Sequence, residues 1–344
     1  MNEHISYAMR NGEATKAWLS FNVPSELLDW SHFAIEVLIY IGLGLAIAHA
    51  WRTFKSSGSP SALLTLLAAL LYGLFMDILS YYTVENFWHG EFSIMLLFNK
   101  LPLYIVCLYP ALIYHLIMTI RRYDFPKLTE AICTGFFGGF MYMIFDNFGP
   151  MAGWWIWDTS DLTTLPYVSS VPLTSYAWFF LFTSAFTYIN RTISWEWVEN
   201  GERKLKIVIA HAIQPIATVF VGALLFIPHN LFAKSSPPYD MIPWDANIQM
   251  AAFVHVILFS LAGWLFLMKW RTPKYERDSL LMVFPFLYLT GLVYMYIAKL
   301  HLFFTGTNEG LSQGLSVGNL LVVFIAIAVS TTVLLMSHPV PKKK

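Results

Sequence analysis

The most constraining feature of this sequence is a series of long segments that carry almost no charge. Each is about 20 residues long, and polar or charged residues separate it from the next: 33–51, 62–82, 101–120, 128–148, 172–189, 207–228, 246–268, 280–304 and 315–336. An α-helix of about 20 residues crosses the hydrocarbon core of a bilayer, which is about 30 Å thick. Because a helix pairs its own backbone groups, it is stable in that environment. The sequence therefore predicts an all-α fold, a polytopic transmembrane helix bundle with about nine spans.

The composition supports this class of protein and argues against others. Only 12% of the 344 residues are charged and 57% are hydrophobic, whereas soluble domains carry about 25% charged residues. The 21 basic and 21 acidic side chains give a formal net charge of zero, so there is no basic excess to neutralise nucleic-acid phosphates. Two cysteines are too few for a disulfide framework or a cysteine-ligated metal cluster. We therefore expect a membrane protein that has no nucleic-acid partner.

The distribution of basic residues predicts the orientation of the chain. Lysine and arginine gather in the first, third, fifth and seventh loops and in the last three residues, whereas the fourth loop, 157–171, has none. The positive-inside rule then predicts an N-terminus outside and a C-terminus in the cytoplasm. We expect an external segment at 1–30, a single transmembrane helical domain at 31–338 and a basic cytoplasmic tail at 339–344. The bacterial inner membrane is the expected location.

Several ionisable side chains fall inside the predicted spans, where each costs several kcal/mol and invites a functional explanation. Asp77 and Asp146 lie in the outer halves of their spans, and carboxylates in general are concentrated toward that leaflet. This pattern predicts a cavity that opens toward the outer side. Lys299 could neutralise either aspartate or extend to the lipid headgroups, and its position near a span end favours the second role.

Four polar residues near the end of the second span are spaced four apart: Asp77, Tyr81, Glu85 and His89. If the helix continues that far, they share one stripe. The stripe could be a polar wall in which Glu85 and His89 ligate a metal, or it could be a solvated helix end. One carboxylate–histidine pair with no second pair of matching spacing favours the solvated end.

Histidines also raise the question of a cofactor. His211 and His255 could ligate a haem between two spans, but their predicted depths differ, and one bis-histidine haem needs similar depths. The ten histidines are scattered, whereas a metal-dependent lipid oxidase or desaturase would need them in dense clusters. We therefore expect no metal and no other cofactor.

Aromatic residues make up 17% of the chain, and they are not confined to the membrane interfaces. Interfacial belts explain tryptophans at span ends. Trp178 and other rings in mid-span could instead be plain packing, or could form a flat slot for a polyene or isoprenoid. The faces of such rings would also stabilise a carbocation.

The order of residues in the middle of the chain carries a resemblance. The run Asp146-Asn147-Phe148-Gly149-Pro150-Met151-Ala152-Gly153-Trp154-Trp155-Ile156-Trp157 resembles a signature of a carotenoid-biosynthesis membrane family. That family includes the bacterioruberin-precursor hydratases and the bacterial carotenoid 1,2-hydratase type. Its signature resembles Asp-x-x-x-Asp-Pro followed by Gly-x-Trp-x-Trp, with Asp146 at the second aspartate. A second run, 171–179, resembles the family's Val-Pro-x-x-Asn-x-x-Gly-Trp segment.

The likeness covers about residues 71–182, a third of the chain, and departs from the family pattern at three positions. Tyr142 stands at the first aspartate, Asn147 replaces the proline and Ser175 replaces the asparagine. The last four predicted spans have no clear counterpart in the pattern.

The resemblance implies a cofactor-independent hydratase of the lyase class, which adds water to a terminal C=C bond of an isoprenoid or carotenoid. Asp146 would be the acid, and Asp77 would position water or share the proton. The residues expected to bind substrate are Trp155, Trp157, Trp178, Tyr142, Asn147, Ser175 and Lys299.

Two other function classes remain open from the sequence. A non-catalytic pigment- or lipid-binding membrane subunit needs only the aromatic slot. A proton-coupled transporter would use the membrane carboxylates and histidines, but the odd number of spans and the lack of a detectable inverted repeat argue against it. In each case the expected partner is a membrane lipid or polyene, and a homo-oligomer or a larger membrane complex is expected as well.

Overall fold

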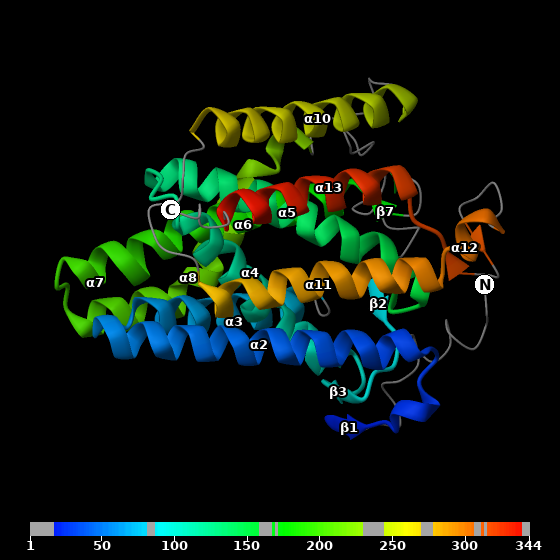
Figure 1. The fold of residues 1–344 in the computed structure, drawn as a ribbon, viewed down its shortest axis with the longest axis horizontal. Helices are drawn as coiled ribbons and strands as arrows, with labels where there is room; N and C mark the ends of the chain where they lie inside the picture. The colour runs from blue at the N-terminus through cyan, green and yellow to red at the C-terminus, as the bar shows by residue number, and fades with distance from the viewer. Residues whose placement is uncertain are drawn as a thin grey trace, which may run out of the picture.

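The computed structural model describes residues 17–80, 87–157, 167–168, 171–229, 244–269, 278–305, 311–312 and 315–338. A long helix lies at each of the nine predicted segments: α2 (Trp30–Ser57), α3 (Ser61–Leu79), α4 (Leu103–Arg121), α5 (Lys127–Ala152), α6 (Leu173–Asn190), α8 (Lys204–Leu225), α10 (Trp244–Lys269), α11 (Ser279–Ala298) and α13 (Leu320–Ser337). Most of them extend along the longest dimension of the molecule (Figure 1). The prediction of an all-α helical bundle is therefore confirmed.

In the described part of the chain, eight helices are long and apolar enough to cross a membrane. The protein is accordingly a membrane protein. A span was also predicted at helix α6, but α6 is less apolar than these eight helices, because five of its 18 residues are serine or threonine. These hydroxyl groups lie inside the bundle, and Ser184 and Thr187 each donate to the carbonyl group four residues earlier.

Helices α4 and α5 form the centre of the bundle. In the most apolar 18-residue stretch of each helix, 83% of the residues of α4 and 78% of those of α5 are buried, against 17% in α10. Helix α10 lies at the outside of the bundle (Figure 1). Helix α5 packs most extensively against α6. Their close approach depends on Gly135, because a Cβ atom there would lie 2.4 Å from the carbonyl oxygen of Phe180.

Short strands at one end of the bundle are the main feature that hydropathy did not predict. Three form a sheet, β1 (Leu19–Phe21), β3 (Ile94–Leu96) and β4 (Leu101–Pro102), and β2 (Phe87–His89) pairs with β5 (Trp155–Trp157). Two further pairs are β6 (Tyr167–Val168) with β7 (Val171–Pro172) and β8 (Leu311–Ser312) with β9 (Leu315–Ser316). Strands of two or three residues are too short to give a periodic signal.

One predicted span needs correction. The segment 280–304 is not one helix, because α11 ends at Ala298 and α12 (His301–Phe304) follows after a break at Lys299. Within the expected external segment, the described residues before α2 form β1 and a 3-10 helix, η2 (Pro24–Glu26).

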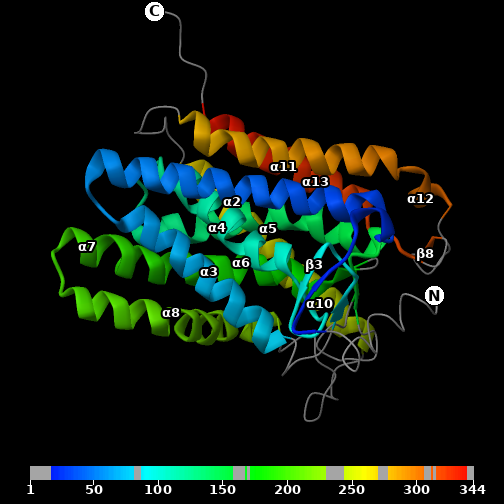
Figure 2. The ribbon, with the colours of Figure 1, turned by 90° about the horizontal axis from the view of Figure 1, so that it is seen from below.

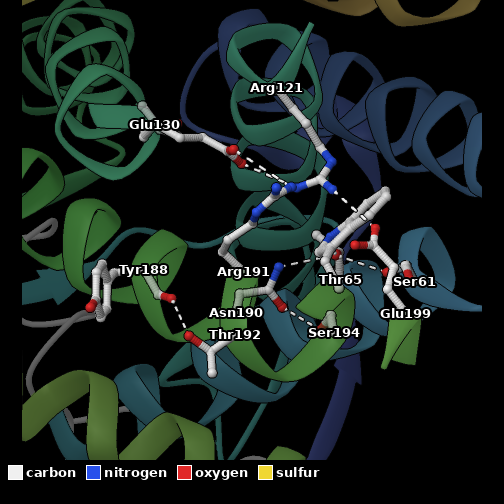
Figure 3. A network of polar contacts seen from close by, with 12 residues as sticks. Ser61, Thr65, Arg121, Glu130, Tyr188, Asn190, Arg191, Thr192, Ser194 and Glu199 are labelled. Carbon is white, nitrogen blue, oxygen red and sulfur yellow. Dashed lines mark hydrogen bonds and ion pairs between the residues drawn. The ribbon is translucent and has the colours of Figure 1, made fainter. Parts of the chain in front are cut away.

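The opposite end of the bundle carries the short helix α7 (Trp197–Glu199) (Figures 1 and 2). Polar contacts join the helices there (Figure 3). Glu130 of α5 is buried, and its carboxyl oxygens lie 3.4 Å from Arg121 and 3.8 Å from Arg191. Asn190 donates to Thr65 of α3 over 3.0 Å. Arg191 begins a π-helix, η4 (Arg191–Glu196), so this turn connects to both α3 and α5.

Candidate functional site

A cavity of about 290 Å³ lies inside the bundle, between helices α3, α4, α5, α6 and α8 and the two-stranded sheet of β2 and β5. Most of its wall is aromatic. The residues that line it are Asp77, Ser80, Phe87, His89, Ile105, Leu108, Tyr109, Tyr142, Phe145, Trp155, Trp157, Thr174, Ser175, Trp178, Phe179, Phe182, Ala223 and Phe226.

The sheet covers this cavity with alternate residues. Phe87 pairs with Trp157 and His89 pairs with Trp155 in the antiparallel register, and side chains two apart on a strand share one face. All four of these residues line the cavity. We call them the aromatic roof. Trp155 lies against Gly149 at the end of α5, where a Cβ atom would come within 2.0 Å of the indole ring.

Asp77 is the carboxyl group in the cavity wall. It lies near the end of α3, only 4% of its surface is exposed, and Tyr109 of α4 provides its hydrogen bond. Its second oxygen, Oδ2, has no hydrogen-bond partner in the described structure. Tyr109 approaches α3 closely because Gly73, one turn before Asp77, has no side chain.

Asp146 lies close to the cavity but is not one of its lining residues. It is completely buried, and neither carboxyl oxygen makes a hydrogen bond of normal geometry within the described residues. The side chain that interacts with it is Ser175, which lines the cavity. Tyr142 lies within electrostatic range of both Asp146 and Asp77, so the two carboxyl groups share one region of the bundle.

The predicted substrate-binding residues separate into two groups. Trp155, Trp157, Trp178, Tyr142 and Ser175 line the cavity. Tyr142 stacks on Phe179 with a centroid distance of 3.4 Å, and Trp178 stacks on Phe182 at 4.0 Å.

Asn147 and Lys299 are not lining residues. Asn147 is buried, and both ends of its side-chain amide make hydrogen bonds: Nδ2 donates to the carbonyl group of Met143, and Oδ1 accepts from the backbone N–H group of Asn319. Lys299 pairs with Asp29 over 2.8 Å and not with Asp77 or Asp146, the two aspartates that the sequence offered as partners besides the favoured lipid headgroups.

His89 reaches the cavity from β2 and not from a continued helix. Helix α3 ends at Leu79, so the predicted helical stripe does not extend to His89, and Tyr81 and Glu85 lie outside the described residues. Burial lowers the pKa of His89 to about 3, and its ring nitrogen Nδ1 lies 3.3 Å from the carbonyl oxygen of Trp154. Across the described residues there is no cluster of three or more metal-ligating side chains.

Sequence reasoning missed several lining residues. Tyr109, Phe182 and Phe226 are uncharged residues of predicted spans, and nothing in their spacing distinguishes them from ordinary core residues. Phe87 was missed because the strand that carries it was not predicted. Tyr109 directly follows Leu108 in an apolar predicted span, and a tyrosine there gave no signal comparable to that of a membrane aspartate.

Comparison with known proteins gives a family but no activity. The family model DUF7802, described as a domain of unknown function, matches residues 22–236, more than half of the chain. All residues that line the cavity lie within this match. No curated protein and no solved structure matches the chain.

Proposed function

The chain belongs to the DUF7802 family, and we propose that its cavity binds the end of an isoprenoid-like membrane lipid and hydrates a terminal C=C bond. The observation that carries the proposal is Asp77, a carboxyl group with an unpaired oxygen in an aromatic wall. A buried polar group without a partner costs about 1–3 kcal/mol. Such a cost is typical of a group retained for binding or chemistry.

The size of the cavity limits what part of a lipid it can hold. A cavity of about 150 Å³ in another protein accommodates benzene, so about 290 Å³ accommodates about twelve non-hydrogen atoms. Two isoprene units have ten carbon atoms and fit this volume. A longer polyene would place only its end in the cavity, and the rest of its chain would remain in the bilayer.

The chemistry follows from one acid and a set of rings. The protonated carboxyl group of Asp77 gives its proton to the CH carbon of the double bond, which leaves a tertiary cation on the terminal carbon that carries the two methyl groups. The faces of Tyr142 and Phe179, which stack on one another, stabilise this positive charge. Water then adds to the cation and returns a proton to Asp77, so that the net change is alkene plus water to alcohol.

This assignment exchanges the roles that the resemblance implies for the two aspartates. Asp77 lines the cavity and Asp146 does not, so Asp77 is the better acid. Asp146 would act through Ser175 as a positioning residue. The resemblance to carotenoid hydratases supports the reaction class, and the two residues lie in the part of the chain that it covers.

The proposal includes an orientation. Basic residues such as Arg121 and Arg191 lie at the α7 end of the bundle, opposite the strands, so we infer that this end faces the cytoplasm. The cavity would then lie near the outer leaflet. An inner membrane of a bacterial cell is the proposed location.

The test is expression of the full-length protein in a host that makes polyenes with terminal double bonds, followed by mass spectrometry of the pigments. We expect a product heavier by one water, which the Asp77→Asn variant no longer makes. Asp146→Asn should retain measurable product, because its carboxyl group does not face the substrate. If the wild type carries an unmodified lipid through purification, the protein is a lipid-binding subunit instead. If it makes no product and carries no lipid, the proposed function is wrong.

A further inference from the structure

The aromatic roof contains two indole N–H groups that have no acceptor. Nε1 of Trp155 and Nε1 of Trp157 are both buried and unpaired in the described structure. Tryptophan N–H groups usually find a partner when they are buried. Because the two residues are two apart on β5, they lie on the same face of the strand, toward the cavity that both line.

A third unsatisfied atom belongs to the wall beneath the roof. Asp77 Oδ2 has no partner in the described residues, while its carboxyl group already interacts with Tyr109. The cavity therefore has two donors and one carboxyl oxygen available within a wall that is otherwise mostly apolar. A hydrocarbon occupant could satisfy none of them.

We propose that the cavity recognises a lipid end that carries an oxygen atom, with a hydroxyl group as the best match. Its oxygen accepts a hydrogen bond from Trp155 or Trp157, or from both, and its O–H group donates a hydrogen bond to Oδ2 of Asp77. This inference rests on the proposed function, since it concerns the same cavity. It adds the chemical class of the ligand: a terpenoid alcohol of about ten carbon atoms, or the alcohol end of a longer isoprenoid, such as the alcohol that hydration of the terminal C=C bond forms.

The roles of the roof residues differ from those of the other rings. Trp178 also lines the cavity, but it stacks on Phe182, and its indole nitrogen is not among the buried unpaired atoms. Trp155 and Trp157 would be specificity residues for the oxygen, whereas Trp178 would contribute contact area to any lipid. Replacing each by phenylalanine removes the N–H group and keeps an aromatic ring.

The experiment is a competition assay on the purified full-length protein in detergent. Geraniol and the matched hydrocarbon 2,6-dimethyl-2,6-octadiene, which lacks only the hydroxyl group, compete against a photoreactive isoprenoid probe. Each hydrogen bond contributes about 0.5–1.5 kcal/mol, which corresponds to about a two- to tenfold change in affinity. We expect the wild type to prefer the alcohol about tenfold, and Trp155→Phe and Trp157→Phe each to reduce this preference about threefold.

The control is Trp178→Phe, which should weaken both ligands by the same factor and leave their ratio unchanged. Equal affinity of the wild type for alcohol and hydrocarbon would overturn the inference while leaving a lipid-binding cavity. Failure of the wild type to bind either ligand, or the probe, would overturn the proposed function as well. The wild-type comparison decides the matter even if a roof variant does not fold.

Discussion

Replacing Gly73 by alanine tests whether the contact between α3 and α4 supports the cavity. A Cβ atom at this position would lie 2.4 Å from Cγ and 2.5 Å from Cβ of Tyr109, whereas carbon atoms in contact are about 3.5–4.0 Å apart. These atoms are at the root of the tyrosine side chain, so rotation of the ring cannot relieve the clash. The two helices must therefore separate by about 1 Å.

Overpacking of this kind costs about 1–3 kcal/mol, and alanine recovers about 0.5–1 kcal/mol in a helix interior. We expect Gly73→Ala to lower the free energy of unfolding by about 0.5–2 kcal/mol, the difference between these two effects. Gly44 of α2 is the matched control, since its added Cβ would meet nothing within 4 Å. Gly44→Ala should raise the free energy of unfolding by about 0.5–1 kcal/mol.

Denaturant unfolding of both variants in the same detergent gives the two values. Gly73→Ala should also weaken binding of the isoprenoid probe, because a displaced Tyr109 no longer supports Asp77. Stabilisation of Gly73→Ala to the same extent as Gly44→Ala would refute the close packing of the two helices.

The remaining predictions concern the polar groups. Glu130→Gln should lower the free energy of unfolding by about 3 kcal/mol, because it removes the buried carboxylate that two half-buried arginines contact. Glu199→Gln changes the exposed carboxylate that contacts Arg121 and should cost about 0–1 kcal/mol; equal melting temperatures of the two variants would contradict this. Burial lowers the pKa of His89 to about 3, below the value of about 6.5 in the unfolded chain. Because the unfolded chain therefore binds the proton first, the free energy of unfolding should fall as the pH drops from about 6.5 toward 3. His89→Gln should flatten that part of the profile of melting temperature against pH, and an unchanged profile would argue against a buried neutral ring. Asn147→Ala should lower the melting temperature but leave the ratio of geraniol to hydrocarbon affinity unchanged, since Asn147 does not line the cavity; a changed ratio would place it at the ligand.

The sequence predicted the helices well because length and apolar composition are what a bilayer selects. The break between α11 and α12 at Lys299 and the strands of the aromatic roof were not predictable in the same way. The break lies within an otherwise continuous apolar segment. The roof depends on the pairing of β2 with β5, which are more than sixty residues apart, and no local pattern in either strand indicates its partner.

The site was predictable in its chemistry but not in its geometry. Membrane aspartates and nearby tryptophans identified the region, since carboxyl groups are costly there. Which aspartate faces the cavity depends on how each helix is rotated about its own axis. On α5 the cavity meets Tyr142 and Phe145 but not Asp146, and that rotation is fixed by packing against α4, α6 and α13, not by residues adjacent in sequence.

Asn147 connects α5, which lies within the family match, to the segment that begins α13, which lies outside it. Its Oδ1 accepts a hydrogen bond from the backbone of Asn319, the residue whose side chain caps α13, and Gly318 fits closely beside it. A chain cut after residue 236 would retain every cavity residue, yet it would leave this buried oxygen without that donor and uncover a face of α5. A protein truncated at the boundary of the family match should therefore be less stable than the full chain.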